Sequence, residues 1–455
     1  MFSIIRRLLV LVATLTVVAA VSGCAESTRE AATGKGSIRG VNAIVTAPQV
    51  NFLIEERVLG NVDFKGNSGF NSFDDLSYNF NFDLLRPGII EPDRLTTQFI
   101  DVIADSEYTV VLTGTIANPS SFFWEDPIRE WSGTETVFEI VFAHLAPSMG
   151  ELDLYFAAPG TVPVMGQAVG SLTNGARLAI LEFEEAPYEL ILTPKDDPAT
   201  IVYQSVQLVP IAQIRATIAV FDADPTVTGN VGVSFIAEAG GSSVLSDVNF
   251  PPQTRTLHAA FGTENFDGYF DSDFANILFA DIGFQELSPY ADVPQAVTLV
   301  TLTPVGNSGA VIHEAELNIA PGTNSNIVLV GEPGSLLFAF LLNDGRSLET
   351  FPTIRILNAS VSTETLDVYM LPPGTSIDDT LIPQISGIPS LANTGFIATF
   401  EGMLELTITL PGEKTPIAPP VILDLATGDT VDTVIVDTVN PGLVELLIVD
   451  FQAAP

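Results

Sequence analysis

The sequence predicts an all-β protein built from four tandem β-sandwich domains behind an N-terminal signal helix. Short stretches of alternating apolar and polar residues end at Pro and Gly turns, as Thr365–Leu371 does before Pro372. A unit of about 100 residues, the size of one sandwich, occurs four times. After the first 24 residues, no segment combines sustained helical periodicity with capping residues.

The N-terminus predicts export and lipid attachment. Arg6 and Arg7 precede an uncharged, mostly apolar run over 8–21, which is shorter than the ~20 residues that a membrane-spanning helix needs. Val21-Ser22-Gly23-Cys24 resembles the lipobox of bacterial lipoproteins, in which the cysteine receives a diacylglyceryl group and a further acyl chain such as palmitate. Cys24 is the only cysteine, which favours this reading over an uncleaved anchor or an ordinary secretory signal. We therefore predict lipidation of Cys24 and attachment to a lipid bilayer.

Ala25 follows the cysteine, where Asp would favour retention in the inner membrane. By analogy with Gram-negative lipoproteins we expect the outer membrane, with the chain facing the periplasm or the surface. Residues 24–36 are predicted to be a flexible tether, because they hold few large apolar side chains.

The charge balance argues against two kinds of partner, nucleic acids and anionic lipid headgroups. The chain has 55 acidic and 17 basic residues and a formal net charge of −38. Phosphate backbones need a basic surface, so we expect no nucleic-acid binding. Attraction to anionic lipid headgroups is excluded on the same ground.

The four units repeat one pattern. Each begins with a short strand that ends in Asn or His, and nine residues later an Asp or Asn lies in a second strand. The pairs are Asn42 and Asn51, His144 and Asp153, His258 and Asp267, and Asn358 and Asp367. A β-rich strand then follows in each unit, for example YTVVLTG from Tyr108. The predicted domains are 37–130, 131–242, 243–350 and 351–455, after a signal peptide over 1–23, and we picture them as a string of self-contained units.

These motifs carry a family resemblance. The FAHLAP and LHAAF openings, the LDVY strand and the YTVVLTG strand resemble the bacterial exported family "domain of unknown function 4397". The resemblance spans about 37–455 and implies tandem immunoglobulin-like sandwiches at the cell envelope, with no assigned reaction. The first unit departs most, because Asn51 replaces Asp and the segment 67–92 reads as an aromatic-rich insertion.

The residue types that are capable of catalysis or metal binding favour structural roles in this sequence. A His–Asp pair can tune a base or bind a metal. Two of the four units have Asn instead of His, however, and Asn does not titrate, so we expect these side chains to bond the following loop.

The GNSG stretches around Ser68 and Ser308 lack a histidine base and an orienting carboxylate at the required positions, so we interpret them as turns. The acidic pairs do not follow a calcium-loop pattern; they are Asp222 with Asp224, Asp271 with Asp273, and Asp378 with Asp379. The aromatic residues over 70–82 and around Trp124 and Trp131 are expected to fill cores.

We therefore predict no catalytic, cofactor-binding or metal-binding residues and no enzyme activity. The expected function is a lipid-anchored envelope protein acting as a non-catalytic structural, adhesive or spacer module. The alternative is a carbohydrate- or peptide-binding envelope lipoprotein, and the partner in either case is an unidentified envelope protein or glycan. Convex units joined end to end would favour the spacer, and a concave aromatic-lined groove the binder.

Overall fold

A computed structural model describes residues 32–224, 227–294, 297–343 and 345–451. The predicted all-β class is confirmed: the described residues form eight sheets, which pair into four sandwiches. The predicted signal helix over 1–23 and Cys24 lie outside the described residues. In the part that is described, no helix has the length and apolar character to span a bilayer.

The first sandwich consists of one sheet in the order β4-β1-β7-β8 and a second in the order β3-β2-β5-β6. Every second residue of β2 is buried in the core of this sandwich; these residues are Val50, Phe52 and Ile54. The strands are β1 (Lys35–Asn42), β2 (Val50–Ile54), β3 (Arg57–Val62), β4 (Asn71–Asp74), β5 (Ser77–Leu84), β6 (Asp93–Asp101), β7 (Ser106–Gly114) and β8 (Pro119–Pro127). The last two residues of the predicted tether therefore belong to β1.

The second sandwich pairs a five-stranded sheet, β12-β9-β15-β16-β17, with the sheet β11-β10-β13-β14. Its strands are β9 (Val137–Leu145), β10 (Leu152–Ala157), β11 (Gly170–Leu172), β12 (Leu181–Glu184), β13 (Glu189–Pro194), β14 (Tyr203–Gln204), β15 (Arg215–Asp222), β16 (Val231–Ala237) and β17 (Ser242–Leu245). β17 thus runs three residues past the predicted boundary at 242.

The third and fourth sandwiches repeat the plan of the first. The third has the sheets β21-β18-β24-β25 and β20-β19-β22-β23, and the fourth has β29-β26-β32-β33 and β28-β27-β30-β31. The third comprises β18 (Gln253–His258), β19 (Phe266–Phe270), β20 (Ile277–Ile282), β21 (Ala291–Asp292), β22 (Val297–Pro304), β23 (His313–Asn318), β24 (Asn324–Glu332) and β25 (Ser335–Leu342). The fourth comprises β26 (Thr353–Asn358), β27 (Thr365–Leu371), β28 (Ile385–Pro389), β29 (Ile397–Ala398), β30 (Gly402–Thr409), β31 (Val421–Leu425), β32 (Thr430–Asp437) and β33 (Val444–Val449).

The first sandwich has the same strand plan as the others, so one expectation about it is wrong. The segment 67–92 is not an insertion, because it holds β4 and β5. These strands take the sheet positions that β12 and β13 take in the second unit. The aromatic residues of β5, Phe80 and Phe82, are buried in the core, and their unusual composition hid the correspondence.

The opening strand of every sandwich pairs in parallel with its β-rich strand. The pairs are β1 with β7, β9 with β15, β18 with β24, and β26 with β32. A parallel pair requires a crossover between its strands, and here the second sheet is built from that crossover. The motif strands therefore lie in opposite layers: β1 carries Asn42 in one sheet, and β2 carries Asn51 in the other.

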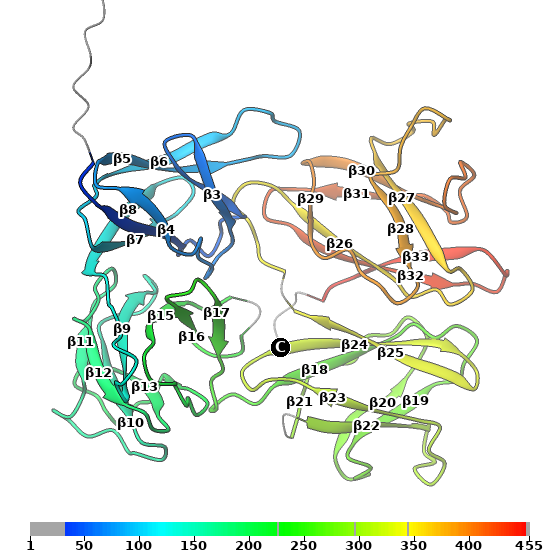
Figure 1. Ribbon diagram of the computed structural model, residues 1–455. Helices are drawn as coiled ribbons and strands as arrows, with labels where there is room; N and C mark the ends of the chain where they lie inside the picture. Colours follow the sequence, from blue (N-terminus) through cyan, green and yellow to red (C-terminus); the bar gives the residue numbers. More distant parts are fainter. Residues whose placement is uncertain (1–31, 225–226, 295–296, 344, 452–455) are drawn as a thin grey trace, which may run out of the picture.

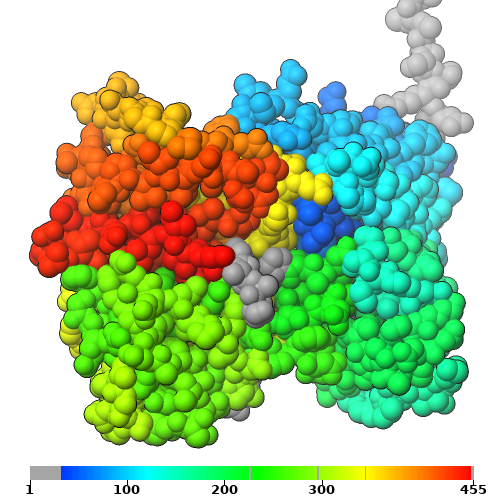
Figure 2. Space-filling view, turned by 180° about the vertical axis from the view of Figure 1, so that it is seen from behind, coloured from blue at the N-terminus to red at the C-terminus, as the bar shows by residue number. Residues whose placement is uncertain are grey.

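The sandwiches do not form a string. Figure 1 shows a two-by-two block, with the first sandwich against the second and the fourth against the third. Each sandwich has its own core. A further buried cluster joins the first and second sandwiches through Val41, Val111, Ala143 and Phe221, among others. Another joins the third and fourth, and Figure 2 shows this second pair in contact from behind.

Candidate functional site between the sandwiches

The Asn and His side chains at the ends of the opening strands are buried and bonded to the loop that follows. Asn42 Oδ1 accepts the N–H of Ile44 at 3.1 Å, and Asn358 Oδ1 accepts the N–H of Ser360 at 3.1 Å. His144 Nδ1 does the same for Ala146 at 3.2 Å, and its Nε2 lies 2.9 Å from Gly150 O. Burial lowers the pKa of His144. These bonds are the structural ones expected from the exchange of Asn and His.

Each aspartate of the second motif strand links the neighbouring edge strand (β11, β20 or β28) to a loop. Asp267 Oδ1 accepts the N–H of Asp281 at 2.8 Å, and its Oδ2 accepts the N–H of Gly306 at 2.8 Å. Asp367 likewise accepts from Gly387 at 2.7 Å and Gly412 at 3.0 Å. Asp153 accepts the N–H of Asp196 at 2.9 Å and a bond from Ser171. Both oxygens of each of these aspartates are thus bonded within its own sandwich.

His258 follows this pattern only in part, because its buried Nδ1 has no hydrogen-bond partner among the described residues. Burial lowers the pKa of its imidazole, and Nε2 lies 3.2 Å from Glu264 O. His313, which lies near Ser308 in the sequence, packs edge-on against Phe338, and burial lowers its pKa as well. The His and Asp of each pair (His144 with Asp153, His258 with Asp267) therefore bond different neighbouring groups, and no hydrogen bond joins the two members of a pair among the described residues.

The remaining sequence candidates also have structural partners. Ser68 accepts the N–H of Gly40, and the stretch around Ser308 is a turn in which Asn307 O accepts the Ala310 N–H. Asp222 bonds Ser148, Asp271 bonds Thr298, and Asp378 bonds Thr380. Among the described residues, no group of three or more His, Cys, Asp or Glu side chains could hold a metal ion. Core filling is confirmed for Phe73, Phe80 and Phe82.

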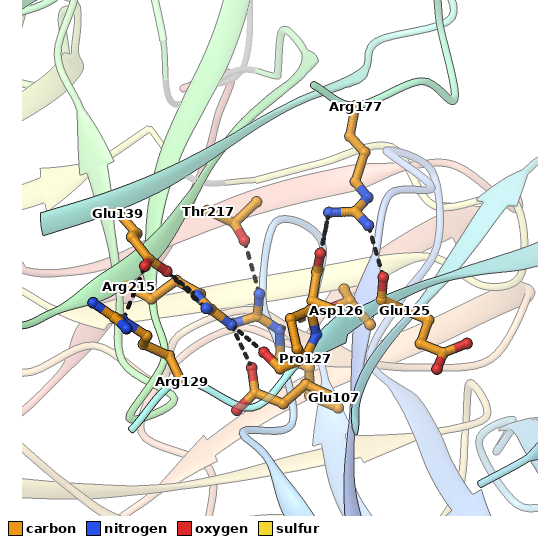
Figure 3. Close-up of polar contacts among 11 residues, drawn as sticks. Glu107, Glu125, Asp126, Pro127, Arg129, Glu139, Arg177, Arg215 and Thr217 are labelled. Atoms are coloured by element: carbon orange, nitrogen blue, oxygen red, sulfur yellow. Dashed lines mark hydrogen bonds and ion pairs between the residues drawn. The ribbon is translucent and has the colours of Figure 1, made fainter. Parts of the chain in front are cut away.

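A network of charged side chains, which no sequence motif indicated, lies between the first two sandwiches (Figure 3). Arg177 of the second sandwich donates to both oxygens of Asp126 in the first and, at 2.9 Å, to Glu125 O. Arg215 donates to Pro127 O at 2.7 Å and lies 3.5 Å from Glu107. These bonds cross the interface and fix the relative orientation of the two sandwiches.

The same network continues within the second sandwich and the linker. Arg215 pairs with Glu139 at 2.7 Å, and Arg129 pairs with Glu139 at 3.0 Å. Burial, followed by the nearby Glu238, raises the pKa of Glu107 to about 7. This carboxyl group therefore takes up a proton near neutral pH.

Buried arginines recur at the interfaces. Arg39, Arg255 and Arg355 each stand three residues before the motif Asn or His. Arg39 donates to Thr217 of the second sandwich at 2.8 Å. Arg255 donates to Asp450 O at 2.7 Å, and Arg355 donates to Leu342 O at 2.8 Å, so these two bond across the other pair. Their common spacing was visible in the sequence and could have indicated a shared interface role.

A cleft of about 500 Å³ opens between the first and fourth sandwiches. The first sandwich contributes mainly polar side chains, including Gln49, Asn51 and Asn61. The segment before the fourth sandwich also contacts the first sandwich. Arg346 in this segment donates to Val45 O at 2.6 Å and Ala47 O at 3.0 Å and pairs with Asp63. Residues 345–351 thus link the fourth sandwich to the first.

Fold and contacts together define a multidomain β-sandwich protein whose units lock to one another. The family described as "Domain of unknown function (DUF4397)" matches residues 36–155 and 252–369, and the chain belongs to this family. No curated protein matches the chain.

Two solved structures show weak similarity. The Bacillus anthracis TIE protein has 8% identity and a TM-score of 0.16, over 90% of this chain and 69% of that one. A product complex of the multi-modular glycogen-degrading pneumococcal virulence factor SpuA has 5% identity and a TM-score of 0.16, over 73% of this chain and 38% of that one. Scores this low carry no conclusion about the present chain.

Proposed function

We propose that this chain is a lipid-anchored, non-catalytic protein of the cell envelope, in which four sandwiches act as one rigid structural or adhesive block. The observation that carries the proposal is the set of contacts between sandwiches. Buried apolar clusters join both pairs, and buried arginines donate across them. A loosely tethered chain would have interfaces that are smaller and more polar.

The state of the motif side chains supports a non-catalytic role. A general base needs a nitrogen or carboxylate within reach of a substrate proton. His144 and His258 are buried and bond their own loops, and Asp267 and Asp367 receive backbone N–H groups on both oxygens. The bonded atoms of these side chains therefore hold the protein's own loops and strands and do not face a substrate site.

Anchoring would come from Cys24. Several acyl chains give stable membrane attachment without any spanning segment. Changing Cys24 to Ser should move the protein from the membrane to the soluble fraction after cell fractionation, with the unchanged chain as the control. Persistent membrane association of the variant would contradict the anchoring role.

Rigidity has its own experiment. In the Cys24→Ser background, introduced cysteines are the only thiols and take spin labels selectively. Labels at Val58→Cys and Ile422→Cys report on the first and fourth sandwiches, since both side chains are half exposed on strands. Labels at Ile422→Cys and Ile448→Cys within the fourth sandwich give the reference width. If the block is rigid, the distance distribution between the two sandwiches should be about as wide as the one within the fourth sandwich. A much broader distribution between the sandwiches would contradict rigidity.

A second candidate function, ligand binding, is favoured by one specific observation. The block has a cleft at a domain boundary, which is a common position for binding sites. Phe351 and Phe396 line this cleft. A concave groove lined by aromatic side chains is the feature expected of a ligand-binding protein and not of a spacer.

A further inference from the structure

We propose that the cleft between the first and fourth sandwiches binds a neutral carbohydrate. Its volume of about 500 Å³ lies within the roughly 300–1,000 Å³ of small-molecule sites. One wall is polar and comes from β2, β3 and the residues beside them; the other is mainly apolar and comes from the fourth sandwich and the segment before it. A sugar ring has the same two-sided character, with hydroxyl groups at its edge and C–H groups on its faces.

The polar wall is made largely of amides. Gln49, Asn51 and Asn61 line it, and Asn51 and Asn61 are directly opposite each other in the β2–β3 register. Asn61 donates to Gln49 Oε1 at 2.9 Å, and this bond uses neither the carbonyl oxygen of Asn61 nor the amino group of Gln49. Amides both donate and accept, and adjacent sugar hydroxyls need both functions.

Asn51 departs from its counterparts in a way that suits this role. In the other sandwiches the equivalent residue is a buried aspartate that links an edge strand to a loop. Asn51 is only partly buried and lines the cleft. Asp83 stands opposite it on β5 and pairs with Arg94, and an amide at position 51 adds no second carboxylate to this pair. The amide is therefore tolerated at this position and presents its polar atoms to the cleft.

The apolar wall offers a stacking surface. The partly exposed ring of Phe396 provides it, and the largely buried Phe351 and Leu348 complete the wall. The guanidinium of Arg355 lies over the Phe396 ring, 4.4 Å from its centroid, so the ring is held in place from the side of the buried arginine. A fixed aromatic ring favours contact with a flat apolar face at low entropic cost.

The charges of the cleft favour an uncharged ligand. Its two charged lining residues, Arg346 and Asp63, pair with each other, and Arg346 also donates to two carbonyl groups. The net charge of −38 on the whole chain opposes acidic glycans. A peptide would instead be expected to add to the edge of β3, which ends its sheet.

The test measures binding of the full-length protein, in detergent micelles, to neutral hexasaccharides by titration calorimetry. The panel covers glucose, galactose, mannose and N-acetylglucosamine backbones, and a mixed neutral peptide library is titrated separately. We expect saturable binding of at least one sugar. The double variant Asn51→Ala/Asn61→Ala should weaken it at least about tenfold, and the exposed control Asn174→Ala, on the second sandwich, should not.

Three results would overturn the proposal: no sugar binds at millimolar concentration, the double variant binds as the unchanged chain does, or only peptides bind. Thermal unfolding of each variant is measured alongside, so that a loss of binding is not confused with a loss of fold. The anchoring and rigidity experiments are independent of this outcome.

Discussion

A single nitrogen of Arg177 donates to both carboxylate oxygens of Asp126, at 2.7 and 2.8 Å, and so joins the second sandwich to the first. Both side chains are largely shielded from water. We expect Arg177→Ala to lower the free energy of unfolding of this pair of sandwiches by about 1–2 kcal/mol, because a charged hydrogen bond is lost and Asp126 is left without it. Urea denaturation would measure the change.

The control for this change is Lys195→Ala. Lys195 pairs with Glu151 on the surface of the second sandwich, where both groups are more exposed. Exposed pairs contribute little, so the denaturation curve should be unchanged. Equal losses in the two variants would mean that the Arg177 pair has no special role at the interface.

Stability is expected to fall as pH rises through neutrality, because of Glu107. Burial and the nearby Glu238 raise the pKa of Glu107 from 4.5 to about 7. The folded state then binds more protons than the unfolded state between these values. The contribution of this group is thus fully present below pH 4.5 and is lost as pH rises through about 7.

Glu107→Gln tests this pH dependence, since the amide imitates the protonated acid at every pH. Thermal unfolding between pH 5 and pH 8 should show a shallower decline in the variant than in the unchanged chain. Parallel curves would assign the pH dependence to other groups, such as Asp247, whose pKa burial also raises.

Arg355→Ala should be severely destabilising. Arg355 and Asp432 form an ion pair at 2.6 Å with side chains only 3% and 2% exposed. Removing one partner leaves a buried charge, which costs about 3–5 kcal/mol. The double variant Arg355→Met/Asp432→Leu should recover part of that loss, as measured by calorimetric or urea unfolding. If the double variant is less stable than Arg355→Ala, charge burial is not the dominant cost.

Gly40→Ala is expected to disrupt the first sandwich. A methyl group at Gly40 would overlap the rings of Phe52 and Phe80 in the core. Overpacking of this kind costs about 1–3 kcal/mol, and a shift in thermal unfolding would report it. Gly241→Ala is the matched control, because its methyl group would meet no atom within 4 Å. A stable Gly40→Ala protein would show that these rings can move.

The strands and the four-fold repetition were predictable because they depend on local order. Alternation in Thr365–Leu371 placed Leu366 and Val368 in a core, where they lie. It did not reveal that Asp367 and Tyr369, on the other face, are buried as well. The loops that cover them come from residues distant in the sequence, such as Lys414, which donates to the Tyr369 hydroxyl at 2.8 Å.

The contacts between sandwiches were not predictable from the same patterns. Charged residues such as Arg177 and Asp126 read as surface residues in any single unit, and only the docking of two units buries them. Arg39, Arg255 and Arg355 did carry a signal, because an arginine at a fixed distance before the motif is unusual in an acidic chain. The cleft depends on Asn51, whose departure from Asp was visible but had no spatial meaning without the fold.

The contact between Arg346 and Asp63 has a consequence for how the molecule is made. These residues are 283 positions apart, and a ribosome or an export channel delivers the chain from its N-terminus. The first two sandwiches therefore have time to mature as a pair before their final neighbour emerges. The contact between the first and fourth sandwiches can form only after the second half of the chain has emerged. Its formation carries the entropic cost of bringing distant chain segments together. Until then the β2–β3 hairpin of the first sandwich is uncovered, and a truncated chain would display it permanently.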